Sequence, residues 1–196
     1  MTTHPHPLRA RTLAGLLATT LSLGLSLLSA GAVQAQSLVV NPGSTTTEVG
    51  QSFSLTVEGK DFATAIVGGG FNLSFDPTML HLDSISIPTS WELFRSTGLL
   101  DEASGTVTDV SFNTFSSPKA GDFLTATLNF TAVGVGTSQV RLAPSTPYVF
   151  ADVDVNQVNP SFGSATVTVS AVPEPASLAL LLAGAGVVAV VRRRQG

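Results

Sequence analysis

Residues 123–132 read Phe-Leu-Thr-Ala-Thr-Leu-Asn-Phe-Thr-Ala, with apolar and polar side chains in alternation. A period of two residues is typical of a β-strand that buries one of its faces. The pattern predicts that one face points into a core, with Leu124, Ala126, Leu128 and Phe130. It predicts that the other face meets solvent, with Thr125, Thr127, Asn129 and Thr131.

The same alternation recurs in short runs that Gly, Pro, Asp and Asn separate. In one run, Phe71, Leu73 and Phe75 should face the core, with Asn72 and Ser74 opposite. We expect strands at residues 37–40, 51–59, 66–75, 81–87, 91–95, 106–113, 122–133, 138–142, 148–152 and 163–170. Many short strands, without a convincing amphipathic helix, predict an all-β domain of the sandwich or jelly-roll type.

The first 35 residues differ in character from this middle. They begin with a polar segment that carries Arg9 and Arg11, continue with a Leu- and Ala-rich run at 13–28, and end in Val33-Gln34-Ala35. This order indicates a signal peptide that is cleaved between Ala35 and Gln36. An N-terminal membrane anchor is the alternative, and the small residues before the expected cut argue against it.

Residues 172–196 contain Val-Pro-Glu-Pro, an apolar run at 176–191, and three arginines. A helix over that run would span about 24 Å, short of a hydrocarbon core of roughly 30 Å. The arginines should stay on the cytoplasmic side. The order closely resembles the PEP-CTERM sorting signal of Gram-negative bacteria; a plain tail anchor is the alternative. The motif residues are Pro173, Glu174, Pro175, Arg192, Arg193 and Arg194.

That resemblance implies a processing partner. An exosortase, a membrane-embedded cysteine protease-transpeptidase, would recognise the Pro-Glu-Pro motif and remove the tail. Together the two ends predict an exported protein at the cell surface or outside the cell, anchored in the membrane only transiently. The expected organisation is a signal peptide at 1–35, a β-domain at 36–171 and a sorting signal at 172–196.

Composition narrows the function of the β-domain. Between residues 36 and 172 there are twelve acidic side chains and four basic ones, Lys60, Arg95, Lys119 and Arg141. Such a surface repels phosphates, so we expect no nucleic-acid partner. The chain has no cysteine, which excludes disulfides, thiol nucleophiles and cysteine-based zinc sites.

Five segments in order resemble the cohesins, receptor modules that capture dockerin domains in cellulosomes and related surface assemblies. The segments are 49–55, 66–80 with its Phe-Asp-Pro-Thr-Met-Leu turn, 123–132, 148–152 and 163–169. The resemblance covers roughly residues 37–170. It implies a jelly roll of about nine strands that binds a protein through one sheet face. Carbohydrate-binding modules share this kind of sandwich, so the ligand class stays open.

The resemblance also suggests where a partner would bind. Outward-pointing polar residues on the strands concerned form a candidate binding face: Asn72, Ser74, Asp109, Ser111 and Asn113. The chain has no dockerin-like calcium repeat, so a dockerin-type partner would be a separate protein.

Little in the domain suggests catalysis. His81 is the only histidine after the signal peptide, and no Gly-x-Ser-x-Gly turn accompanies it. Gly68-Gly69-Gly70 lacks the Lys-Ser/Thr pair of a phosphate loop and fits a bulge or strand entry better. Asp152 and Asp154 are weak candidates for Ca²⁺; no other cofactor is expected. Trp91 and Tyr148 are the only large amphipathic aromatics, few for a sugar-stacking face.

The sequence therefore favours a non-catalytic, cohesin-like binding module. Its partner would be a dockerin-type protein or an extracellular polysaccharide assembly. The alternatives are a carbohydrate-binding module and a passive structural protein of the extracellular matrix or biofilm.

Overall fold

The structure is a computed structural model that describes residues 1–2, 35–173 and 193. Residues 3–34 of the predicted signal peptide and the sorting residues Glu174, Pro175, Arg192 and Arg194 lie outside the described residues. In the part of the chain that is described, no helix has the length and apolar character needed to cross a membrane.

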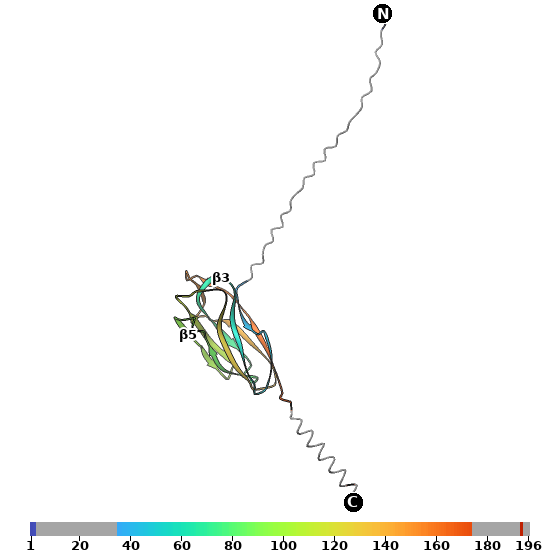
Figure 1. Cartoon of the computed structure of the whole chain (residues 1–196), viewed down its shortest axis with the longest axis vertical. Helices are drawn as coiled ribbons and strands as arrows, with labels where there is room; N and C mark the ends of the chain where they lie inside the picture. Colours follow the sequence, from blue (N-terminus) through green and yellow to red (C-terminus); the bar gives the residue numbers. More distant parts are fainter. Residues whose placement is uncertain (3–34, 174–192, 194–196) are drawn as a thin grey trace. The chain divides into compact units, whose positions relative to one another are not determined.

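Residues 37–170 form thirteen strands (Figure 1). They are β1 (Ser37–Asn41), β2 (Ser44–Glu48), β3 (Ser52–Ser74), β4 (Leu80–Ser86), β5 (Phe94–Ser96), β6 (Leu99–Asp101), β7 (Thr106–Asn113), β8 (Lys119–Ala132), β9 (Gly136–Pro144), β10 (Phe150–Asp152), β11 (Gln157–Val158), β12 (Ser161–Phe162) and β13 (Ser164–Ser170). The predicted all-β jelly-roll sandwich is confirmed.

The strand β3 connects the two layers of the sandwich. Its first part, residues 52–59, pairs with β1 and β8, and β8 also pairs with β4. Its second part, residues 66–74, pairs with β7 on one side and with β9 and β10 on the other. The short strands β5 and β6 extend the second layer beyond β7, and β13 joins β9 to β2.

The sequence predicted two strands at 51–59 and 66–75, whereas β3 is one strand of 23 residues. The register of β3 against β8 shifts three times between Val57 and Ile66, and these irregularities let the strand pass from one layer to the other. Asp61 lies in this segment and has a positive φ of 57°. Strand pairs remain on both sides of Asp61, Ser37 with Lys60 and Gly121 with Phe62, which explains why the Gly-Lys-Asp signal at 59–61 does not interrupt the strand.

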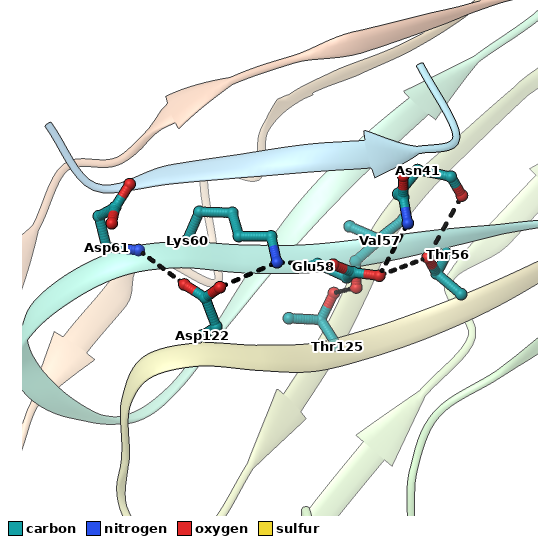
Figure 2. Close-up of polar contacts among 8 residues, drawn as sticks. All are labelled: Asn41, Thr56, Val57, Glu58, Lys60, Asp61, Asp122 and Thr125. Atoms are coloured by element: carbon teal, nitrogen blue, oxygen red, sulfur yellow. Dashed lines mark hydrogen bonds and ion pairs between the residues drawn. The ribbon is translucent and has the colours of Figure 1, made fainter. Parts of the chain in front are cut away.

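An ion-pair cluster lies beside this crossing segment (Figure 2). The Lys60 ammonium lies 2.9 Å from Glu58 and 3.0 Å from Asp122. Asp122 also accepts the backbone N–H of Asp61 at 3.2 Å, and Thr56 donates to Glu58 at 2.8 Å. Hydrogen bonds from Lys60 lower the pKa of both carboxyl groups, and these carboxylates raise the pKa of Lys60. The cluster fixes β3 to β8 where their pairing is least regular.

One hydrophobic core lies between the layers. Phe71, Leu73 and Phe75 are buried, as predicted. Aromatic rings contact one another across the core, for example Phe75 with Phe130 at 5.3 Å between ring centroids. Since the chain has no cysteine, this packing and the sheet hydrogen bonds stabilise the domain without disulfides.

The predicted faces of residues 123–132 are wrong at two positions. Ala126, Leu128 and Phe130 are buried as expected, but Leu124 is 39% exposed and Thr125 is fully buried. Val57 pairs with Ala126 whereas Glu58 pairs with Leu124, so Thr125 is the extra residue of a β-bulge. A bulge moves the side chains beyond it to the opposite face. The Thr125 hydroxyl is satisfied inside by donating to the Val57 carbonyl at 2.7 Å.

Candidate binding face

The residues that the sequence analysis selected lie on two neighbouring strands of the second layer. Four of them are partly exposed, but Ser111 is buried with 1% of its surface exposed, so the prediction that it meets solvent is wrong. Asn72 and Ser74 lie on β3, and Asp109, Ser111 and Asn113 lie on its neighbour β7. Asn113 pairs with Gly68 and Ser111 with Gly70. Four of the five therefore lie along the line where β3 and β7 pair, which we call the seam. Ser74 lies at the end of this seam, opposite Thr106 and Arg141.

The polar groups of Asn72 and Asp109 bind to the domain itself. The Asn72 side chain accepts the backbone N–H of Asp109 at 2.8 Å and donates to the Pro144 carbonyl at 3.0 Å. Ser145 donates to the Asp109 carboxylate at 2.8 Å. Asp109 has a positive φ of 65°, at the register shift between β3 and β7. These contacts hold the irregular part of β7 and fix the start of the loop 145–149.

Three glycines occupy β3 next to this seam. A Cβ on Gly69 would lie 2.6 Å from the Phe150 ring, and a Cβ on Gly70 would lie 2.6 Å from the Cβ of Tyr148. The glycines therefore lie inside a strand, where Phe150 and Tyr148 approach the backbone from opposite faces. Neither a strand entry nor a phosphate loop is present here; close approach of other residues explains the three glycines.

A groove of about 370 Å³ crosses this glycine-rich part of the sheet. Ser111 and Asn113 belong to its lining, with Phe94 from β5 and Tyr148 from the loop 145–149. The Phe94 and Tyr148 rings are 6.5 Å apart between centroids and inclined by 25°. They are 48% and 39% exposed, so two nearly parallel rings face solvent above a floor of glycines. The Ser111 hydroxyl is buried and has no hydrogen-bond partner among the described residues.

Sequence reasoning missed most of the apolar residues around this groove. Leu93 is 63% exposed and Val149 is 45% exposed, and both line the groove with Phe94. Phe115, 82% exposed, follows the segment that pairs with β5. Large apolar residues are assigned to the core by default. The close spacing of Trp91, Leu93 and Phe94 could have indicated an exposed apolar residue here, since one strand face cannot bury all three.

Glu92 holds the loop that presents Phe115. Its carboxylate accepts the Thr114 hydroxyl at 2.6 Å and the backbone N–H groups of Phe115 and Ser116, each at 2.8 Å. The N–H of Ser116, the Thr114 hydroxyl and the N–H of Phe115 hold the pKa of Glu92 far below its usual range. The loop around an exposed phenylalanine is thus fixed by an ionised carboxylate.

Trp91 has a different position from the other aromatics. It is fully buried and contacts Phe112 at 4.5 Å between ring centroids. Its indole N–H donates to the Leu124 carbonyl at 3.0 Å. Trp91 therefore belongs to the core, and it cannot share a sugar-stacking surface with Tyr148. The expected strand at 91–95 begins only at Phe94.

The acidic and imidazole candidates lie elsewhere. The Asp152 carboxylate accepts the backbone N–H groups of Asp154 and Asn156 at 2.9 and 2.8 Å, and the Asn156 amide at 3.1 Å. Hydrogen bonds from Asn156, in the first place, lower the pKa of Asp152. His81 is exposed on β4, with its Nε2 3.9 Å from Asp83. Over the residues described, no group of three or more His, Cys, Asp or Glu side chains is placed to hold a metal.

Comparison with known families identifies the tail. Residues 171–195 match the PEP-CTERM protein-sorting motif. No curated protein sequence matches the chain.

Solved structures resemble the β-domain. One is a cohesin of a type I cohesin–dockerin complex from Clostridium thermocellum, with 14% identity and a TM-score of 0.57 over 69% of this chain and 99% of that one. A non-cellulosomal cohesin from the archaeon Archaeoglobus fulgidus gives 13% identity and 0.57 over 69% and 91%. The cohesin module of a Clostridium perfringens family 33 glycoside hydrolase gives 15% identity and 0.55 over 70% and 97%. At these identities the likeness shows the fold.

Proposed function

We propose that this exported PEP-CTERM protein, whose domain has the cohesin fold, is a non-catalytic module that captures a dockerin-type protein through the groove between Phe94 and Tyr148. The observation that carries the proposal is the pair of exposed rings beside a glycine floor, on the sheet face that the cohesin resemblance selected. An exosortase would process the tail and leave the module at the cell surface or free outside the cell.

The chemistry of the groove suits a protein surface. The sides of the groove are apolar, and their residues are partly exposed: Leu93, Phe94, Tyr148 and Val149. Aromatic residues in a desolvated centre supply most of the binding free energy at protein interfaces. Asn113 adds an amide group at the floor of the groove.

The position of the domain's last strand supports display of this groove. β9 pairs with β13 near its start, where Gly136 opposes Val169, and with β3 at its end, where Pro144 opposes Phe71. The nine residues of β9 span about 30 Å. The chain thus leaves β13 at the end of the sandwich away from the groove, so a tail held at the membrane would leave the groove accessible.

The test is binding of purified dockerins to the exported protein by calorimetry, with and without calcium. Phe94→Ala and Tyr148→Ala should each weaken binding about tenfold or more. The matched control is Leu99→Ala, which removes an apolar side chain 74% exposed on β6, outside the groove lining. Equal losses of affinity in all three variants, or no binding of any dockerin to the unchanged protein, would reject the proposal.

Polysaccharide is the second candidate ligand, because the Phe94 and Tyr148 rings offer a flat exposed surface. Retention on extracellular polysaccharide that is lost in Tyr148→Ala, together with no dockerin binding, would favour this candidate. Retention of neither ligand would favour a passive structural role.

A further inference from the structure

Gln36 is the residue at which the described domain begins to form. Its carbonyl accepts the backbone N–H of Ser161 at 3.0 Å. The next residue, Ser37, starts β1 and pairs with both Lys60 and Ser161. Ala35 is exposed. The expected cleavage between Ala35 and Gln36 therefore falls where the chain enters the sandwich, and it makes a glutamine the first residue.

We propose that the mature N-terminus of this protein is pyroglutamate, formed from Gln36 after export. The α-amino nitrogen attacks the side-chain amide carbon, Cδ. The N–Cδ bond forms, the Cδ–Nε2 bond breaks, and the amide nitrogen leaves as ammonia with a proton from the amine. The step needs no oxidant, reductant or further reactant, and the loss of ammonia makes it practically irreversible.

The environment of Gln36 is compatible with the cyclic form. Cyclisation consumes the α-amine and the side-chain amide, so the carbonyl that accepts from Ser161 stays in place. In the uncleaved chain, with Ala35 in place, the Gln36 side-chain oxygen is buried and has no hydrogen-bond partner among the described residues. An unpaired buried acceptor destabilises the state that contains it. Ring closure moves this oxygen by joining Cδ to the backbone nitrogen.

The charge of a free α-amine at Gln36 also favours the cyclic form. Gln36 is partly buried, and a charged terminal ammonium there loses part of its hydration, whereas a lactam carries no charge. An α-amine has a pKa near 8, so roughly a tenth is neutral and nucleophilic at pH 7. An opposing contribution would come from Asp61, because Gln36 and Asp61 are the residues next to the last pair of β1 with β3, Ser37 with Lys60. An ammonium paired with Asp61 would slow the cyclisation of Gln36, but each ring that forms is permanent.

The test uses the full chain, exported by a Gram-negative host and recovered outside the cytoplasm. Tandem mass spectrometry should find an N-terminal peptide that starts at residue 36 and is lighter by one ammonia. Stepwise N-terminal degradation should be blocked, and pyroglutamyl peptidase should unblock it. Gln36→Ala is the matched control: it should yield the same peptide boundary with a free amine. A mature chain that keeps an open Gln36 with a free amine, or that begins at another residue, overturns the proposal.

Discussion

The three consecutive glycines of β3, at residues 68–70, provide the sharpest test of the packing around the groove. In Gly69→Ala the new methyl carbon would lie 2.6–2.7 Å from three atoms of the Phe150 ring. Carbon atoms that are not bonded pack at about 3.5–4.0 Å, so the ring must move by about 1 Å. It has little freedom to move, because it is buried and contacts Phe62, Phe112 and Phe162.

Overpacking of this kind costs about 1–3 kcal/mol in free energy of unfolding. Replacing glycine by alanine also restricts the unfolded chain, which offsets about 0.4–1 kcal/mol. We expect a net loss of about 1–2 kcal/mol, or a melting temperature lower by about 3–10 °C. The assay is urea and thermal unfolding of the exported protein, followed by circular dichroism.

Two variants isolate the cause of this loss. Gly43→Ala has no atom within 4 Å of the added carbon and reports the unfolded-chain effect alone, so it should be neutral or stabilising. Gly69→Ala combined with Phe150→Leu should lose less than the sum of the single changes, because the smaller side chain relieves the contact. A Gly69→Ala protein as stable as Gly43→Ala would refute the reasoning.

Three further predictions concern the loops and the core. Trp91→Phe should lower the free energy of unfolding in urea by about 1–3 kcal/mol, because it removes the hydrogen bond to the Leu124 carbonyl and leaves space in the core. A smaller loss of stability than for Phe94→Ala would contradict the assignment of Trp91 to the core. The folded-state pKa of Glu92 lies below its ordinary value of 4.5, so the ionised carboxylate stabilises the fold above pH 4.5 and this contribution is lost as the pH falls below that value. The urea midpoint of Glu92→Gln should therefore change less between pH 6 and pH 3 than that of the unchanged protein. Equal changes in the two proteins would count against this role of Glu92. Excess chelator should leave the melting temperature unchanged, because protein N–H groups already bind the Asp152 carboxylate; a clear fall on chelation would restore the calcium hypothesis.

Period-two alternation predicted the β-sandwich well because burial of one strand face is a local property. Phe71, Leu73 and Phe75 follow it fully. The bulge at Thr125 could not be read from residues 123–132, because it exists only relative to the register of β3.

The candidate site was predicted less completely than the fold. The resemblance selected residues on β3 and β7, which do pair with each other, but Asn72 and Asp109 bind to the domain itself. The rings of Phe94 and Tyr148 are 54 positions apart in the sequence. Only the pairing of β5 with β7, and of β10 with β3, brings them to one groove.

Carboxylates hold several loops of this cysteine-free domain. Glu92 binds backbone N–H groups of the loop that carries Phe115, and Asp152 binds those of residues 154 and 156. Asp109, through Ser145, holds the loop that carries Tyr148. Hydrogen bonds of this kind to charged acceptors are stronger than neutral ones. Apolar side chains that are fixed before binding lose less conformational entropy when a partner arrives. The acidic character of the domain therefore has a structural use: its carboxylates keep the groove preformed where other exported domains use disulfides.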